Sequence, residues 1–226
     1  MTHKVNQLLT LASISLIMTV AAGCQGLLGP VTPQKKIMLW NGQDFSGWKL
    51  FIPDKNVDVN EVWSVQNGVL HCTGVPSGYM RTKSAYKNYH LHLEWRWAGK
   101  PTNSGVLLHT KGPDKVWPRC IEAQLMADNA GDFVLIGKGG ITIDGQKKET
   151  LTEPYIIIAK KQKSSEKPAG QWNSYDIYCR EDFICLMVNG VTQNTGIEAT
   201  ASSGNICLQS EGSPIEFRNI YLEPLK

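Results

Sequence analysis

The chain has 226 residues, of which 42% are hydrophobic and 19% charged, with 23 Lys and Arg against 20 Asp and Glu. Seven Trp and seven Tyr supply core material, and the Gly and Pro residues form no low-complexity tract, which excludes a disordered chain, a collagen and a coiled coil. The formal charge of +3 is small and scattered, so we expect no nucleic-acid partner.

The first 23 residues have the pattern of a bacterial lipoprotein signal peptide. Lys4 precedes an apolar run, and the small residues 21–23 stand at the cleavage positions before Cys24. A transmembrane anchor is the alternative, but the run has 16 residues, and spanning a bilayer takes about 20. We therefore predict lipidation of Cys24 and a location on the periplasmic side of the cell envelope. Because Gln25 rather than Asp follows, the outer membrane is favoured over the inner one.

The remaining chain is predicted to form a lipidated tether and one domain. Residues 24–36 have the composition of a tether, and residues 37–226 contain no internal repeat and no linker that would divide them. Within this domain, residues 160–170 are rich in Lys, Ser and Pro and are expected to form an exposed loop.

The periodicity of the domain is that of β-strands. Residues 88–98 alternate apolar residues (Leu91, Leu93, Trp95, Trp97) with polar ones (His90, His92, Glu94, Arg96), and residues 119–126 alternate in the same way. Further strands are predicted in residues 174–180, 183–188, 205–210 and 214–225. Asn67-Gly68, Asp144-Gly145 and Asn189-Gly190 are typical of hairpin turns. The pattern predicts an all-β fold, an antiparallel sandwich or jelly roll.

Five cysteines remain after Cys24, so they do not all pair within one chain (Cys72, Cys120, Cys179, Cys185, Cys207). Cys179 and Cys185 flank a predicted turn. A two-residue loop there would place their thiols on opposite sheet faces, whereas a three-residue loop would set them face to face. We expect free thiols.

Candidate functional residues lie on the polar faces of these strands. If the apolar positions fill the core, outward side chains are expected to cover one concave sheet surface: His92, Glu94, Arg96, His109, Glu122, Gln124, Cys207, Gln209, Glu216 and Arg218. Carboxylates, amides and an arginine, with Trp and Tyr nearby, suit a sugar, whose hydroxyls need hydrogen-bond partners and whose ring face needs an aromatic platform.

Simpler explanations exist for several of these residues. Outward Glu and Arg on a strand usually form solvated ion pairs. The segment EAQLMAD resembles the ExDxxE strand of laminarinase-type glucanases, but Gln124 replaces the central acid and Ala127 the final one, which argues against their double-displacement mechanism. His90, His92, Glu94 and His109 suggest a cupin-like metal cluster, but the cupin spacing is not met. We expect hydrogen-bonding histidines and no cofactor, with a divalent metal as the less favoured alternative.

Several segments, in this order, resemble the 3-keto-disaccharide hydrolase domain family. They are LWNGQDFSGWKL, YKNYHLHLEWRW, NSGVLLHT, RCIEAQLMAD, GGIT, WNSYDIYC, MVNGV and NICLQSEGSPIEFRNIYLEPL, within about residues 37–225. The resemblance implies a jelly roll of the concanavalin A-like lectin and glucanase type. It also implies a substrate that is a 3-keto-glycoside or 3-keto-oligosaccharide. The C3 ketone acidifies the C2 proton, so the aglycone at C1 leaves by elimination, and hydration completes a net hydrolysis. Lyase, hydratase and combined activities remain open.

The resemblance also implies roles for individual residues. Glu122 matches a position for a catalytic acid or base, and Glu94 that of its partner or of a ligand for a substrate hydroxyl. His109 stands where the family has Arg, next to the expected position of the ketone, and is taken as a third catalytic residue. The match implies substrate-binding roles for Gln124, Gln209 and Arg218, although an ion pair with Glu216 or Glu94 is an equal alternative for Arg218. Arg96 and Glu211 are further substrate-binding candidates, and Glu211 stands where His is commoner in the family.

A second hypothesis comes from a different functional class. Lectin-like sandwiches bind glycans as well as cleave them, so the fold does not decide between the two. The alternative to an enzyme is a non-catalytic glycan-binding lipoprotein.

Overall fold

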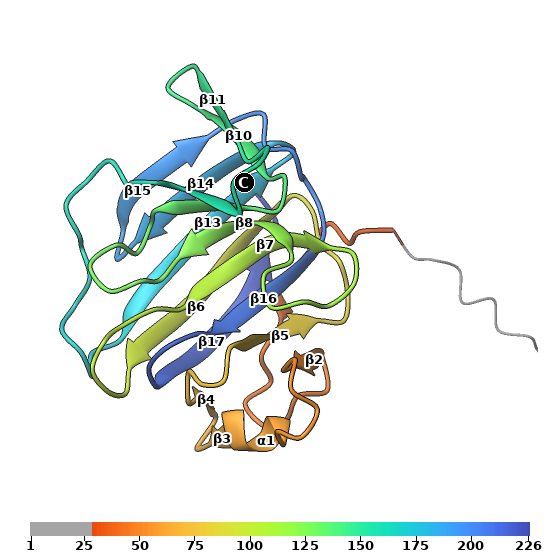
Figure 1. Cartoon of the computed structure of the whole chain (residues 1–226), viewed down its shortest axis with the longest axis vertical. Coiled ribbons are helices and arrows are strands. Elements are labelled where there is room, and N and C mark those ends of the chain that lie inside the picture. Colours follow the sequence, from red (N-terminus) through yellow and green to blue (C-terminus); the bar gives the residue numbers. More distant parts are fainter. Residues whose placement is uncertain (1–28) are drawn as a thin grey trace, which may run out of the picture.

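The computed structural model describes residues 29–226, which form two antiparallel sheets stacked face to face (Figure 1). The eight-stranded sheet has the order β15 (Val191–Gly196), β14 (Phe183–Val188), β13 (Asn173–Arg180), β6 (Tyr89–Trp97), β17 (Ile215–Glu223), β4 (Val69–Cys72) and β3 (Trp63–Gln66), and β1 (Ile37–Met38) also pairs with β17. The seven-stranded sheet has the order β12 (Tyr155–Ile158), β9 (Phe133–Ile136), β8 (Arg119–Gln124), β7 (Gly105–Lys111), β16 (Asn205–Ser210), β5 (Gly78–Thr82) and β2 (Trp48–Phe51).

Two small elements lie at the ends of the sandwich. The hairpin of β10 (Gly140–Ile143) and β11 (Gln146–Glu149) projects at the top of Figure 1, and the short helix α1 (Val59–Val62) lies at the bottom. Among the described residues, no helix has the length and apolar character needed to cross a bilayer. The predicted signal peptide and Cys24 lie outside the described residues.

The predicted alternation is confirmed, and it builds the core between the sheets. Along β6, every second side chain from Tyr89 to Trp97 is buried, and the polar residues between them are half-buried on the outer face. Inward side chains of β8 join the same hydrophobic cluster as those of β6. Burying a row of large apolar side chains from each sheet is the main stabilising term of such a sandwich.

The hairpin predictions are confirmed as well. Asn67-Gly68, Asp144-Gly145 and Asn189-Gly190 each connect paired strands, and all six residues have positive φ, as the two-residue type I′ turn requires. Glu181 and Asp182 form the two-residue loop between β13 and β14, which sets Cys179 opposite Ile184.

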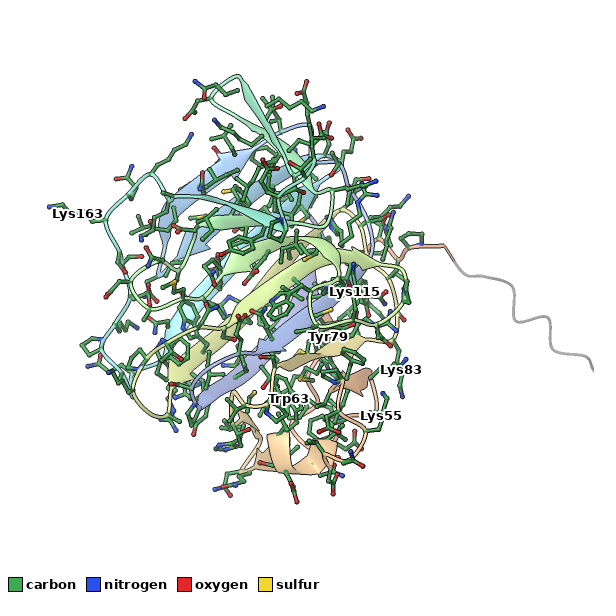
Figure 2. All side chains as sticks on the ribbon, viewed as in Figure 1. Lys55, Trp63, Tyr79, Lys83, Lys115 and Lys163 are labelled. Atoms are coloured by element: carbon green, nitrogen blue, oxygen red, sulfur yellow. The ribbon has the colours of Figure 1, made fainter. Side chains whose placement is uncertain are left out.

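The five cysteines between residues 29 and 226 are free thiols. The segment predicted as a tether is partly packed against the domain, because Val31 forms a bridge with Tyr86 and exchanges backbone hydrogen bonds with Ala85 and Lys87. Residues 160–170 lie in a loop outside the regular strands, from which Lys163 points outward in Figure 2.

The outer faces of the two sheets differ in character. The eight-stranded sheet carries His, Glu and Arg side chains outward. On the seven-stranded sheet a second apolar cluster lies outward of the strands, made of Tyr79, Leu107, Cys120, Val134, Ile136 and Cys207. The middle strands of this sheet are therefore buried on both faces. Polar side chains on these strands are largely shielded from solvent.

Candidate active site

A cleft of about 610 Å³ opens on the outer face of the seven-stranded sheet. Its lining combines a polar end with an apolar wall: Asn103, Trp117, Glu122, Gln124, Met126, Val134, Ile136, Pro154, Tyr155, Ile157 and Glu211. Among these described lining residues there is no Lys or Arg. The cleft thus offers carboxyl and amide groups but no positive charge, which suits a neutral ligand.

Glu122 lies at the centre of β8, where it pairs with Leu107 of β7 on one side and with Val134 of β9 on the other. Only 3% of its surface is exposed, and its Oε1 atom has no hydrogen-bond partner among residues 29–226. Burial, and to a smaller extent the negative charge of Glu211, raises the pKa of Glu122 to about 8. At neutral pH this side chain is a protonated acid that faces the cleft.

Glu211 is the second carboxyl group of the cleft, directly after β16. It is half-buried, and its neighbour Gly212 bridges to Asn103 of the β6–β7 loop. Burial raises the pKa of Glu211, while hydrogen bonding with Asn103 opposes the shift. Two carboxyl groups that share one cleft are the kind of groups that paired acid and base chemistry uses.

Amide groups surround the two carboxyls. The Gln124 side-chain oxygen accepts hydrogen bonds from the backbone N–H groups of Leu125 and Met126, both at 2.9 Å, so its N–H₂ group is the end left to donate to a ligand. Within the described chain, the buried side-chain oxygens of Asn103 and Gln209 have no partner. Buried polar groups are rarely unpaired in native proteins, so this concentration points to a bound ligand.

The apolar wall includes some of the most exposed large hydrophobic residues of the described chain. Trp117, Met126, Tyr155 and Ile157 are each 44–55% exposed, and all line the cleft. An exposed apolar patch of this kind marks a binding surface, and the aromatic rings offer platforms for a sugar ring or an aglycone.

Trp117 is held over the sheet by the loop of residues 112–118. Asp114 of this loop accepts hydrogen bonds from Tyr79 Oη at 2.9 Å and from Lys49 Nζ at 2.6 Å, and Arg81 Nε lies 3.4 Å from it. Figure 2 labels Tyr79 of β5 and Lys115, the residue that follows Asp114 in the loop. Burial alone would raise the pKa of Asp114, but these donors outweigh it and lower the pKa, so the carboxylate stays ionised and anchors the loop.

Four of the predicted site residues meet at this cleft. Glu122, Gln124 and Glu211 line the cleft. Gln209, on β16, lies close to the Glu122 side chain of β8. Asn103, Trp117 and Tyr155 were not predicted. Asn103 belongs to the NSG segment, which is among the motifs that resemble the family. Trp117 lies in a loop and Tyr155 on an edge strand, so no hydrophobic periodicity marked either of them.

The other predicted residues lie elsewhere, so the expectation of one shared surface is wrong. Glu94, Arg96 and Arg218 project from the outer face of the eight-stranded sheet, on the opposite side of the sandwich. Arg218 Nε bonds Glu94 at 2.5 Å, Arg96 bonds Glu216, and both guanidinium groups stack on Trp172. Alternation determines whether a side chain points inward or outward, but strand pairing determines the sheet to which it belongs.

His109 also departs from the expectation, because it points into the core. A β-bulge at this point of β7 gives it a φ of +56°, which reverses the direction set by alternation. Its Nδ1–H donates to the Ala201 carbonyl at 2.8 Å, and Nε2 accepts from Tyr89 Oη at 3.0 Å. Burial lowers the pKa of His109 to about 4, so it is a neutral core residue, and it is not among the residues that line the cleft.

Comparisons with solved structures agree with the fold. A proposed glycosyl hydrolase from Parabacteroides distasonis ATCC 8503 is 24% identical with a TM-score of 0.62, covering 85% of this chain and 94% of that one. A Bacillus licheniformis β-glucanase is 13% identical (TM-score 0.55, 85% and 99% covered). The carbohydrate binding module CBM66 from Bacillus subtilis is 9% identical (TM-score 0.55, 80% and 97% covered). At these identities the likeness shows the fold, a jelly roll of the concanavalin A-like glucanase type.

A search of the curated proteins gives no match. The model of the 3-keto-alpha-glucoside-1,2-lyase-like domain, however, matches residues 35–223, which include every strand of both sheets. This agrees with the resemblance found in the sequence, and it supports a carbohydrate as the compound on which the protein acts. The chain therefore belongs to the 3-keto-alpha-glucoside-1,2-lyase-like domain family.

Proposed function

We propose that the protein cleaves the glycosidic bond of 3-keto-glycosides by elimination across C1 and C2, followed by hydration. The observation that carries the proposal is the buried, protonated Glu122 beside the second carboxyl Glu211, in a cleft without lining cations. A neutral keto sugar matches this charge pattern. A phosphorylated sugar does not, because its recognition calls for Arg or Lys.

The first step removes the C2 proton. The Glu211 carboxylate accepts this proton, and the electrons of the C2–H bond form an enolate whose charge develops on O3. The Gln124 N–H₂ group, oriented by the two backbone hydrogen bonds to its oxygen, donates to that oxygen. A fixed donor aimed at a developing negative charge lowers the barrier more than it would in water.

The second step expels the aglycone. The enolate re-forms the C3 ketone, a double bond forms between C1 and C2, and the C1–O bond breaks as Glu122 protonates the leaving oxygen. Addition of water across the double bond then gives the free 3-keto sugar. Because no oxocarbenium ion is formed, the site does not need the carboxylate pair of a retaining glucanase, in agreement with the absence of that motif from β8.

The test is turnover of a 3-keto-disaccharide by the full-length protein in D₂O. We expect loss of the keto-disaccharide, release of the second sugar, and deuterium at C2 of the product above the level of an enzyme-free control. The parent disaccharide without the ketone should not react. Glu122→Gln should abolish turnover, whereas the same substitution at Glu94, on the opposite sheet, should leave it nearly unchanged. Release of the second sugar without deuterium at C2 would contradict the elimination.

The glycan-binding alternative predicts a different result in the same experiment. One of the structural neighbours is a carbohydrate binding module, so the fold accommodates binding without cleavage. An unchanged substrate together with saturable binding of a glycan would contradict the enzyme hypothesis and support a glycan-binding protein. For either function we propose a lipid-anchored protein on the periplasmic side of the envelope, outer membrane in preference to inner.

A further inference from the structure

Two histidines and an aspartate converge on the outer face of the eight-stranded sheet, opposite the cleft. His90 and His92 point the same way from β6, and Asp176 of β13 stands directly across from His92 in the strand register. His90 Nε2 and His92 Nδ1 each lie 2.8 Å from Asp176 Oδ1. All three side chains are partly buried, with 16–23% of their surface exposed. The metal cluster considered from the sequence included Glu94 and His109, but the structure replaces both with Asp176.

Neighbouring rings hold these side chains in place. His90 stacks on Tyr178 with ring centroids 4.3 Å apart, and His92 stacks on Tyr221 at 4.8 Å. Glu223 Oε2 lies 3.6 Å from His90 Nδ1, the nitrogen that does not face Asp176. A carboxylate in this position orients a metal-binding imidazole and increases its basicity.

We propose that His90 Nε2, His92 Nδ1 and Asp176 form a binding site for a divalent zinc-type cation. Two imidazoles and one carboxylate are a donor set that suits Zn²⁺, and a water molecule would complete the tetrahedron. With metal–ligand distances of about 2.0–2.2 Å, ligand atoms around a tetrahedral ion lie about 3.3 Å apart. The present 2.8 Å separations therefore need to open by only about half an ångström, within the range of small side-chain rotations.

The site is independent of the proposed reaction. It lies on the other sheet, and the ion would join β6 to β13 and, through Glu223, be supported by β17. We infer a structural role, since binding to the folded state alone raises its stability. Ca²⁺ and Mg²⁺ should bind far more weakly, because they prefer oxygen ligands.

The experiment is calorimetric titration of the full-length protein with Zn²⁺, with Ca²⁺ and Mg²⁺ as comparison ions. We expect one Zn²⁺ per chain, release of protons on binding and a rise in Tm of several degrees. Asp176→Asn and His92→Gln should each weaken the binding by more than about tenfold. His71→Gln is the matched control, because His71 lies on the same sheet but pairs with Glu216. Circular dichroism without metal verifies that each variant is folded.

Two results would overturn the inference. The first is that Zn²⁺ changes neither the Tm of the wild-type protein nor the heat measured in the titration. The three side chains would then form only a hydrogen-bond network. The second is Zn²⁺ binding that His92→Gln and Asp176→Asn leave intact, which would assign the ion to other groups of the chain.

Discussion

The carboxyl group of Glu122 occupies the space above the α-carbon of Gly105. A Cβ atom on Gly105 would stand 2.7 Å from Glu122 Cδ, closer still to Oε1, and 2.9 Å from Gln209 Oε1. Gly105 is not in a left-handed conformation, so its role is to leave room and not to relieve backbone strain. The glycine of the NSG segment therefore lets β7 pass beneath the two polar side chains.

Gly105→Ala should impair activity without unfolding the protein. The added methyl group has to displace Glu122 and Gln209, and a shift of about 1 Å at a reacting group costs on the order of 100-fold in kcat. Turnover of the 3-keto-disaccharide measures this loss. Gly47→Ala is the matched control, because its Cβ would meet only the Leu39 carbonyl oxygen at 3.7 Å. Equal turnover rates for the two variants would contradict the steric role of Gly105.

Glu122→Gln should stabilise the protein while it abolishes turnover. Burial raises the pKa of Glu122 from 4.5 to about 8. The free energy of unfolding therefore falls as pH rises from 4.5 to 8, whereas below pH 4.5 this group does not change it. The variant lacks this penalty, and we expect a gain of roughly 4 kcal/mol at pH 8 but almost none at pH 4.5. Denaturant unfolding at both pH values measures it. A gain of equal size at pH 4.5 would contradict the raised pKa.

Asp114→Asn should act on substrate binding through Trp117. Loss of the charge weakens the contacts with Lys49 and Arg81, so the loop of residues 112–118 loosens. We expect KM to rise about tenfold, or ~1.4 kcal/mol, with a smaller change in kcat. Trp117→Ala should have a similar effect. The double variant should be little worse than Trp117→Ala, since both changes remove one interaction. Additive effects would show that Asp114 does not act through Trp117.

His109→Gln should alter the pH dependence of stability and leave turnover nearly unchanged. Burial lowers the pKa of His109 to about 4, so its stabilising contribution is complete above the unfolded pKa of about 6.5 and is lost as pH falls toward 4. Between pH 7 and pH 4 the wild type should lose roughly 3 kcal/mol more than the variant. Denaturant unfolding across this range measures the difference. A large fall in kcat would restore the catalytic role expected from the family resemblance.

Cys24→Ser should abolish lipid attachment in a bacterial host. Without the thiol there is no acceptor for the acyl chains, so metabolic labelling with radioactive palmitate should be lost and the protein should leave the membrane fraction. Continued labelling of the variant would place the lipid on another residue.

The tertiary structure decided which candidate residues meet. Glu94 and Glu122 look equivalent in the sequence, because each is an outward acid on an alternating strand. The structure places β6 in one sheet and β8 in the other, so the two acids lie on opposite sides of the sandwich. His109 follows the alternation in the sequence, but a bulge whose position depends on pairing with two neighbouring strands turns it inward.

The sequence by itself determined the properties that depend on near neighbours. The period of two assigned the core face of β6 and β8, and Asn-Gly and Asp-Gly pairs located three hairpins, because pleat and turn geometry are local. Family motifs pointed to Glu122 and Gln124. The cleft, the loop that carries Trp117, and the approach of Asp176 to two histidines arise from contacts between residues distant in the chain. Such contacts are fixed by strand pairing and packing, which no local pattern encodes.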